Sequence, residues 1–155
     1  MASLYSGPRP LLWGPEKTKG LAVTIEEMAQ TLPNGFHDSW LSQVTVDYVA
    51  QTATLTLDIC IGDSDAPPGE ERDRLRAARL DLLGLEYFIM EPPDPRYEYR
   101  DAGGVMLDLC DSDPAIATPR PLALGGFAGR FFVNDWNAFI HFAARDCRLT
   151  WTNSG

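Results

Sequence analysis

The chain has few of the residues that most often carry catalysis or bind metals. Its 155 residues include only two histidines, His37 and His141, and three cysteines, Cys60, Cys110 and Cys147. No CxxC pair and no group of neighbouring Cys and His residues occurs, so the sequence predicts neither a zinc site nor a disulfide framework. The motifs GxSxG, GxxxxGK[ST], GxGxxG and HExxH are also absent. We therefore predict no metal site and no cofactor.

Basic residues and long apolar runs are scarce as well. Lys and Arg number 13 against 22 Asp and Glu, a net charge of −9. Because like charges repel, this balance argues against nucleic acid or an anionic membrane as a partner, and it suits either a basic protein partner or solubility alone. No stretch approaches the ~20 apolar residues of a membrane span, and residues 1–20 lack the pattern of a signal peptide. With no cysteine framework, these features predict a cytoplasmic protein.

The overall composition is that of a globular domain. Hydrophobic residues make up 45% of the chain and charged residues 23%, and the length fits one domain with a sizeable core. Residues 1–20 contain three prolines and three glycines and show no periodicity. The sequence therefore predicts an irregular arm over residues 1–20 and a single β-rich domain over residues 21–155.

The strongest structural pattern is strict alternation between apolar and polar residues in two runs, 43–50 and 53–61. The apolar positions are Val44, Val46 and Tyr48 in the first run, and Leu55, Leu57, Ile59 and Ile61 in the second. A period of two residues predicts a strand with one face in a core. Because only about three residues separate the runs, they predict a β-hairpin.

The remaining segments predict a short helix and further strands. Residues 24–31 have the capping-box spacing of a helix start, with Thr24 as N-cap and Glu27 three residues later. Residues 70–83 fit either a helix or a strand. The favoured interpretation is a strand over residues 79–90 with Gly84 as a possible bulge, which confines any helix to residues 70–78.

Shorter strands are predicted at 105–109, 127–133, 137–144 and 147–151, with turns at 134–136 and 145–146. Short turns favour antiparallel pairing, because parallel strands need long crossover connections. The predicted fold is therefore mainly β (α+β): an antiparallel sheet or sandwich of about seven strands with one short N-terminal helix.

The candidate catalytic residues are His37, Asp38 and His141. Adjacent side chains point apart, so a simpler interpretation is that Asp38 or Ser39 caps a turn while His37 hydrogen-bonds to backbone. His141 fits a half-buried histidine satisfied by a neighbour. If the two histidines met across the sheet, near Asp38 or Asp47, they would form an acid–base or metal site.

The candidate binding residues lie in acidic loops, where recognition residues usually occur. The run from Asp108 to Asp113 is similar to a calcium loop but lacks the glycine and the distant glutamate of an EF-hand, so a solvated acidic rim is the simpler interpretation. Aromatic residues flank turns near the acidic loops. The resulting candidates are Tyr97, Tyr99, Trp136, Asp63, Asp65, Asp111 and Asp113. Cys147 fits a small buried hydrophobe better than a nucleophile.

The step Phe36-His37-Asp38-Ser39, followed by the two alternating runs, resembles small bacterial families of uncharacterised or immunity-like proteins. Their sheet begins after a Phe-His-Asp-Ser or Phe-His-Asp-Ala step. Residues 85–95 and 137–151 are also similar to such proteins. The resemblance implies a small bacterial, cytosolic, β-rich domain that in some cases neutralises a toxin, and it implies no catalytic residues.

Taken with the acidic charge, these observations predict a non-enzymatic protein-binding domain that engages a basic partner. Two alternatives remain open. One is a small hydrolase or isomerase with a pocket near His37 and His141, and the other is a structural protein that associates only with itself. The positions of the two histidines relative to each other and to any pocket would distinguish the hydrolase or isomerase from the others.

Overall fold

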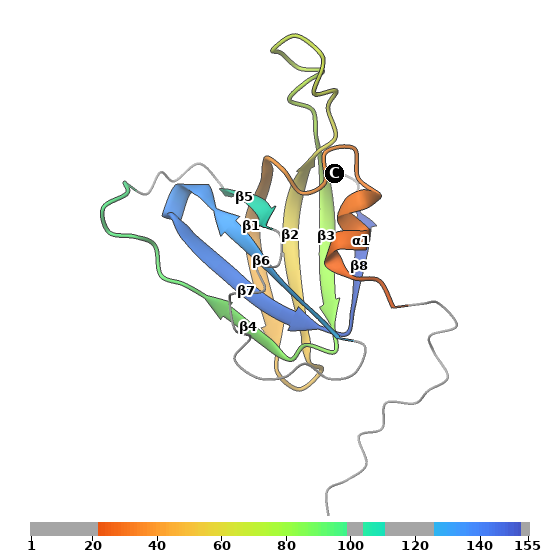
Figure 1. Cartoon of the computed structure of the whole chain (residues 1–155), viewed down its shortest axis with the longest axis vertical. Coiled ribbons are helices and arrows are strands. Elements are labelled where there is room, and N and C mark those ends of the chain that lie inside the picture. The colour runs from red at the N-terminus through yellow and green to blue at the C-terminus, as the bar shows by residue number, and fades with distance from the viewer. Residues whose placement is uncertain (1–21, 99–103, 111–125, 153–155) are drawn as a thin grey trace, which may run out of the picture.

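A computed structural model describes residues 22–98, 104–110 and 126–152. These residues form one short helix, one 3-10 turn and an antiparallel sheet of eight strands (Figure 1). The elements are α1 (Ile25–Gln30), β1 (Ser39–Asp47), β2 (Thr52–Cys60), β3 (Leu75–Leu83), β4 (Tyr87–Met90), β5 (Val105–Cys110), β6 (Phe127–Val133), η1 (Asn134–Trp136), β7 (Ala138–Ala144) and β8 (Asp146–Trp151). The predicted mainly β antiparallel fold is confirmed, with eight strands where about seven were expected. The arm over residues 1–20 and the candidates Tyr99, Asp111 and Asp113 lie outside the described residues.

The predicted capping box starts α1. The backbone N–H of Glu27 donates to Thr24 Oγ1 at 3.1 Å, and the Thr24 N–H donates to the Glu27 carboxylate at 2.8 Å. Ile25 is fully buried, and Val23, just before the helix, accepts a backbone hydrogen bond from Cys147 at 3.1 Å. These contacts hold α1 beside β8 (Figure 1).

The predicted hairpin is formed by β1 and β2. Leu55, Leu57 and Ile59 are buried in the core, as the alternation requires. Tyr48, however, lies beyond the end of β1 and is 89% exposed, so its predicted place on the core face was wrong. The Asp47 carboxylate accepts hydrogen bonds from the backbone N–H groups of Val49 and Ala50. The turn that these bonds stabilise ends β1 before Tyr48.

The predicted strand 79–90 is divided into β3 and β4 at a bend. Leu83 pairs with Asp146, and Tyr87 pairs with Ala143. The chain therefore advances four residues from Leu83 to Tyr87, opposite an advance of three residues from Ala143 to Asp146. The extra residue is that of a β-bulge, and it falls beside Gly84, whose φ is +61°. Residues 70–74 form turns and β3 begins at Leu75, so the helix considered for residues 70–78 was wrong.

The strand order is β4-β7-β6-β5-β1-β2-β3-β8. The two-residue turn predicted between β7 and β8 is instead a corner. β7 pairs with β4 and β6, whereas β8 pairs with β3. The Arg145 N–H donates to the Leu83 carbonyl at 2.9 Å, which places this corner against the β3–β4 bend. The sheet therefore changes direction along both segments at the same point.

Three phenylalanines pack in the core beneath the start of β1. The Phe36 and Phe131 rings are 5.6 Å apart in an edge-to-face arrangement, and Phe131 and Phe142 are 5.2 Å apart. All three are almost completely buried, and burial of one such side chain contributes about 1.5–3 kcal/mol. Ser39 is also buried. The burial of Phe36 and Ser39 fixes the two residues between them, His37 and Asp38, which are exposed.

Cys147 is buried, as expected from its place in the alternation. Desolvation by burial, with smaller contributions from nearby carboxylates, raises the pKa of its thiol to about 12. Such a thiol is not a nucleophile at neutral pH.

Within the described ranges, no helix has the length and apolar character that crossing a membrane would require.

Candidate functional site

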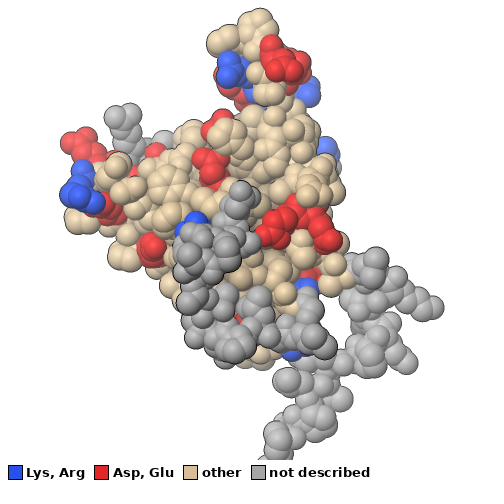
Figure 2. All heavy atoms as spheres, in the orientation of Figure 1, with Lys and Arg blue, Asp and Glu red and all other residues tan. Residues whose placement is uncertain are grey.

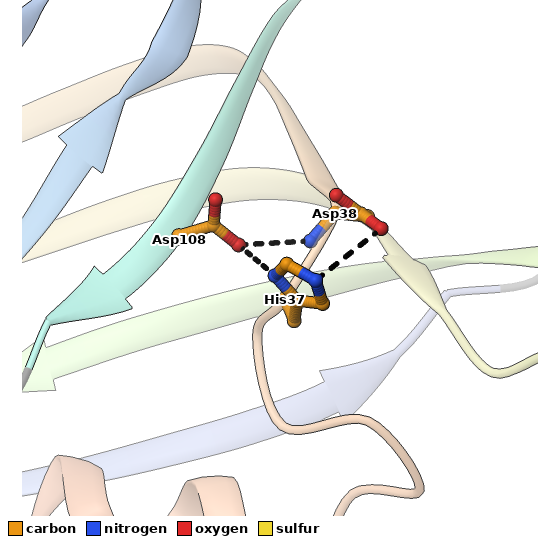
Figure 3. Close-up of side chains that lie close together, drawn as sticks. All are labelled: His37, Asp38 and Asp108. Carbon is orange, nitrogen blue, oxygen red and sulfur yellow. Dashed lines mark hydrogen bonds and ion pairs between the residues drawn. The ribbon is translucent and has the colours of Figure 1, made fainter. Parts of the chain in front are cut away.

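The His37 ring lies against Asp108, which is 71 residues away in the sequence (Figure 3). His37 Nδ1 contacts Asp108 Oδ1, and the Asp38 backbone N–H donates to the same oxygen at 3.1 Å. Asn134 Nδ2 donates to the other oxygen, Oδ2, at 3.2 Å. One carboxylate therefore joins the turn before β1, strand β5 and η1.

The pairing of β1 with β5 brings these residues together. Ser39 lies opposite Leu107 in this ladder, and Trp40 lies opposite Met106. One step beyond the ladder, residue 38 faces residue 108. Because Leu107 is buried, its neighbour Asp108 points to the outer face of the sheet, where His37 is exposed.

The hydrogen bonds shift the proton affinities of both partners in the expected directions. The hydrogen bond to Asp108 raises the pKa of His37 above its ordinary value, although partial desolvation acts against it. Burial alone would raise the pKa of Asp108, but the donors His37, the Asp38 N–H and Asn134 outweigh it and hold this pKa below its usual range. The pair is therefore stabilised as an imidazolium beside a carboxylate.

The other nitrogen of the His37 ring is near Asp38. His37 Nε2 lies 3.6 Å from Asp38 Oδ2, and the two side chains are 70% and 53% exposed. Asp38 has a left-handed backbone, with φ at +54°. The expectation that adjacent side chains point apart is thus wrong at this turn, and His37 contacts carboxylates on both sides instead of backbone (Figure 3).

A cleft of about 440 Å³ opens beside His37. Its lining comes from four parts of the fold: Asn34, His37 and Asp38 before β1; Trp40 of β1; Met106 of β5; and Cys60, Ser64, Arg72, Asp73 and Leu75 at the β2–β3 connection. We call residues 61–74 of this connection the projecting loop, because it extends away from the sheet at the top of Figure 1. The cleft thus lies between the projecting loop and the start of the sheet.

Hydrogen bonds at its base hold the projecting loop in place. Asn34 Nδ2 donates to the Gly62 carbonyl at 2.8 Å and to the Cys60 carbonyl at 3.2 Å. Across the base, the N–H of Ile61 donates to the Arg74 carbonyl at 2.9 Å. A Cβ added at Gly62 would lie 2.0 Å from the Arg72 carbonyl oxygen, so the two sides of the loop can approach this closely only with glycine there.

His141 belongs to a different part of the molecule. It lies on β7, and its Nε2 is 3.2 Å from Glu91 Oε1 at the end of β4. Glu91 also accepts from the Phe139 N–H at 3.3 Å. Strands β6 and β5 separate β7 from β1 in the sheet. The structure therefore does not join His141 to His37, and the shared pocket considered for them is not formed.

The binding candidates in the described part of the chain are dispersed. Asp63 and Asp65 are exposed on the projecting loop, and Tyr97 is 51% exposed in the segment after β4. These two segments leave the sheet at different corners (Figure 1). Trp136 packs partly buried against the core, and its indole N–H is buried without a hydrogen-bond partner, so it does not fit the exposed role predicted for it.

Sequence reasoning did not predict that Asp108 and Asn134 belong to the site. Asp108 was interpreted as part of a solvated rim, and Asn134 was interpreted only as a turn residue. The outward position of Asp108 followed from alternation with Val105 and Leu107. The pairing of β5 with β1 had no signal in the sequence, because many residues separate these strands.

Comparisons with known proteins add little to this geometry. No protein-family model matches the chain, and no curated protein is significantly similar to it. A crystal structure of an uncharacterized protein from Neisseria gonorrhoeae is similar with a TM-score of 0.39 and 10% identity, over 74% of this chain and 91% of that chain.

Proposed function

We propose that this chain is a non-enzymatic binding protein that engages a basic protein partner, in the manner of an immunity-type neutraliser. One observation carries the proposal: the cleft combines an apolar surface with carboxylates at the base of the projecting loop. Trp40, Leu75 and Met106 provide apolar surface, and Asp38 and Asp73 provide carboxylates beside His37 and Arg72. Recognition sites commonly combine a central aromatic contact with a polar surround.

The projecting loop would extend the recognition surface beyond the cleft. It carries Asp63, Asp65, Glu70, Glu71 and Asp73 against Arg72 and Arg74. Acidic and basic side chains gather on it at the top of Figure 2. Glu71 and Arg74 approach to 3.7 Å, and this pair leaves the acidic excess of the loop unchanged. The net charge of −9 would steer a basic protein toward this surface.

A photo-crosslinking amino acid at Ser64, which lines the cleft, tests where a partner binds. The matched control carries the same group at Thr150, an exposed position on β8. In host cells we expect the Ser64 variant to trap a basic protein that the Thr150 variant does not trap. The proposal is wrong if both positions trap the same proteins, or if the only product is a dimer of the chain itself, which would favour self-association.

Charge reversal then tests steering with the trapped partner. The variant Glu70→Lys/Asp73→Lys changes the net charge by the same amount as Glu26→Lys/Glu98→Lys, whose residues lie on α1 and in the segment after β4 and do not line the cleft. We expect the first variant to slow association more than the second and to change dissociation little. Association of the wild type should fall as salt rises past about 0.1 M, where the screening length is about 10 Å. Equal slowing by the two variants would contradict a role for the projecting loop.

A second candidate function is acid–base catalysis at the cleft, as in a small hydrolase or isomerase. The observation that favours it is the contact between His37 and Asp108, because a carboxylate on Nδ1 orients an imidazole and leaves Nε2 available for proton transfer. A panel of p-nitrophenyl esters and phosphates tests it. Turnover that His37→Gln and Asp108→Asn abolish, and that His141→Gln leaves unchanged, would favour catalysis over binding.

A further inference from the structure

We propose that His37 and Asp38 bind a first-row divalent cation of the zinc type through Nε2 and a carboxylate oxygen, with Asp108 as the outer carboxylate that orients the imidazole. The sequence predicted no metal site, because its histidines are isolated and its cysteines do not cluster. The tertiary structure places one histidine and two carboxylates within reach of a single ion. This proposal is independent of any protein partner, since all three residues belong to this chain.

The first argument is the distance between the two ligand atoms. His37 Nε2 and Asp38 Oδ2 are 3.6 Å apart. Zinc bonds to imidazole nitrogen and carboxylate oxygen are about 2.0–2.2 Å long, so a tetrahedral angle places two such ligands about 3.4 Å apart. An ion could therefore bind both atoms with only a small adjustment of two exposed side chains.

The second argument is the state of the other imidazole nitrogen. Metal-bound histidines usually donate their second N–H to a carboxylate or a carbonyl, which fixes the ring and its tautomer. His37 Nδ1 contacts Asp108 in this way. Asp108 is itself held by the Asp38 N–H and by Asn134. Nε2 is thus the nitrogen that a metal would bind, and the ion would displace the proton that Nε2 carries in the imidazolium.

The third argument is space and ligand chemistry. His37 and Asp38 both line the cleft of about 440 Å³, so the remaining coordination positions could be filled by water or by a group entering the cleft. One imidazole with one carboxylate suits zinc, cobalt, nickel or copper, whereas magnesium and calcium prefer oxygen ligands alone. The class of ligand is therefore a late first-row divalent cation.

His141 provides a control for this geometry within the same chain. It also lies beside a carboxylate, but the nitrogen that contacts Glu91 is Nε2, and neither residue lines the cleft. Cys60 is the second control, because its thiol lines the cleft and could bind zinc without His37.

The test is titration of the full chain with zinc chloride by calorimetry, with imidazole nitrogen shifts followed by NMR. We expect saturable binding of one ion, with the Nε2 shift of His37 changing and Nδ1 remaining protonated. His37→Ala and His37→Gln should abolish binding, and Asp38→Asn should weaken it. Asp108→Asn should weaken it about 10–100-fold, the usual effect of losing an outer ligand. His141→Ala and Cys60→Ser should bind like the wild type.

Three results would overturn the proposal: no saturable binding up to millimolar zinc, binding retained in both His37 variants, or binding lost in His141→Ala or Cys60→Ser. Far-ultraviolet circular dichroism of each variant shows whether a loss of binding reflects unfolding. The two His37 variants are a check on folding, because glutamine keeps a polar side chain of similar length at this exposed position.

Discussion

The His37–Asp108 and His141–Glu91 pairs use the same two side-chain types in different surroundings. His37 is 70% exposed in a turn before the sheet, and its carboxylate partner on β5 accepts donors from two other segments, this turn and η1. His141 is 25% exposed on β7, and its partner accepts donors from β7 alone. The first pair joins separate segments and leaves Nε2 beside a cleft, 3.6 Å from Asp38 Oδ2. The second leaves Nε2 engaged with Glu91. The role of a histidine therefore depends on which nitrogen is engaged and on what the other nitrogen faces.

The largest expected loss of stability comes from a substitution at Gly62, where the two sides of the projecting loop approach each other beside the cleft. In Gly62→Ala, the new Cβ would meet the Arg72 carbonyl at 2.0 Å, and backbone atoms can move apart only by opening the projecting loop. We expect a loss of about 2–4 kcal/mol in the free energy of unfolding, measured in urea.

The matched variant on the His141 side is Gly129→Ala. Its Cβ would lie 2.6 Å from the Phe142 ring, which is a side chain and can shift. Overpacking of this kind costs about 1–3 kcal/mol. A larger loss of unfolding free energy for Gly129→Ala than for Gly62→Ala would show that the projecting loop accommodates the added methyl group more easily than the core does.

The next effect compares the two carboxylates. Asp108→Ala leaves three donors without their acceptor, and Glu91→Ala leaves two. We expect a loss of about 1–3 kcal/mol for Asp108→Ala and a smaller loss for Glu91→Ala. Thermal unfolding of the two variants and of the wild type shows which substitution costs more stability. Equal losses would mean that joining three segments adds no stability.

The third comparison is between the histidines themselves. If the hydrogen bond of His37 were buried, His37→Ala would lower the free energy of unfolding by about 1–3 kcal/mol. The exposure of His37 lowers the expected loss for His37→Ala to about 0.2–1 kcal/mol. His141→Ala should cost more, because its ring is less exposed and lies 5.9 Å from that of Phe139. Denaturant unfolding measures both, and the reverse order would contradict the assignment of His141 as the more structural residue.

The smallest effect concerns a third carboxylate, Asp94, near the His141 side. Hydrogen bonds from Arg96, through its side chain and its backbone, hold the pKa of Asp94 well below its usual range. A lowered pKa in the folded state gives stability that is present above about pH 4 and is lost as the pH falls through the folded value. The effect on stability should be slight, because Arg96 is 81% exposed.

An NMR titration of the Asp94 carboxyl measures this shift directly. Arg96→Gln should raise the pKa toward about 3.9, the value of an unperturbed aspartate. Arg148→Gln, at an exposed position on β8, is the control and should leave it unchanged. An Asp94 carboxyl that titrates normally in the wild type would show that the pair is absent in solution.

Several elements could be predicted because their signals are local. The capping box at Thr24 depends on residues three apart, and the β1–β2 hairpin depends on alternation across a short turn. The burial of Phe36 was not predicted from the sequence, although its burial and that of Ser39 are what leave His37 and Asp38 outside.

Other predictions failed because the signal was not local. The apolar run 79–90 gives no indication of where its two parts find partners, and the structure pairs β3 with β8 and β4 with β7. Residues 145–146 have the length of a hairpin turn, yet they form a corner because both flanking strands already have partners on other segments. The charged residues 70–74 suited a helix, but the backbone hydrogen bonds across the projecting loop favoured turns.

The sequence by itself determined the β1–β2 hairpin and the capped helix, because alternation and capping depend only on neighbouring residues. Only the tertiary structure decided that Asp108 would hold His37 and that His141 would lie elsewhere. Asp108 reaches His37 through the β1–β5 ladder, whose partners Ser39 and Leu107 are far apart in the chain. Such pairing is selected by the packing of the whole core, and no short stretch of the sequence contains that information.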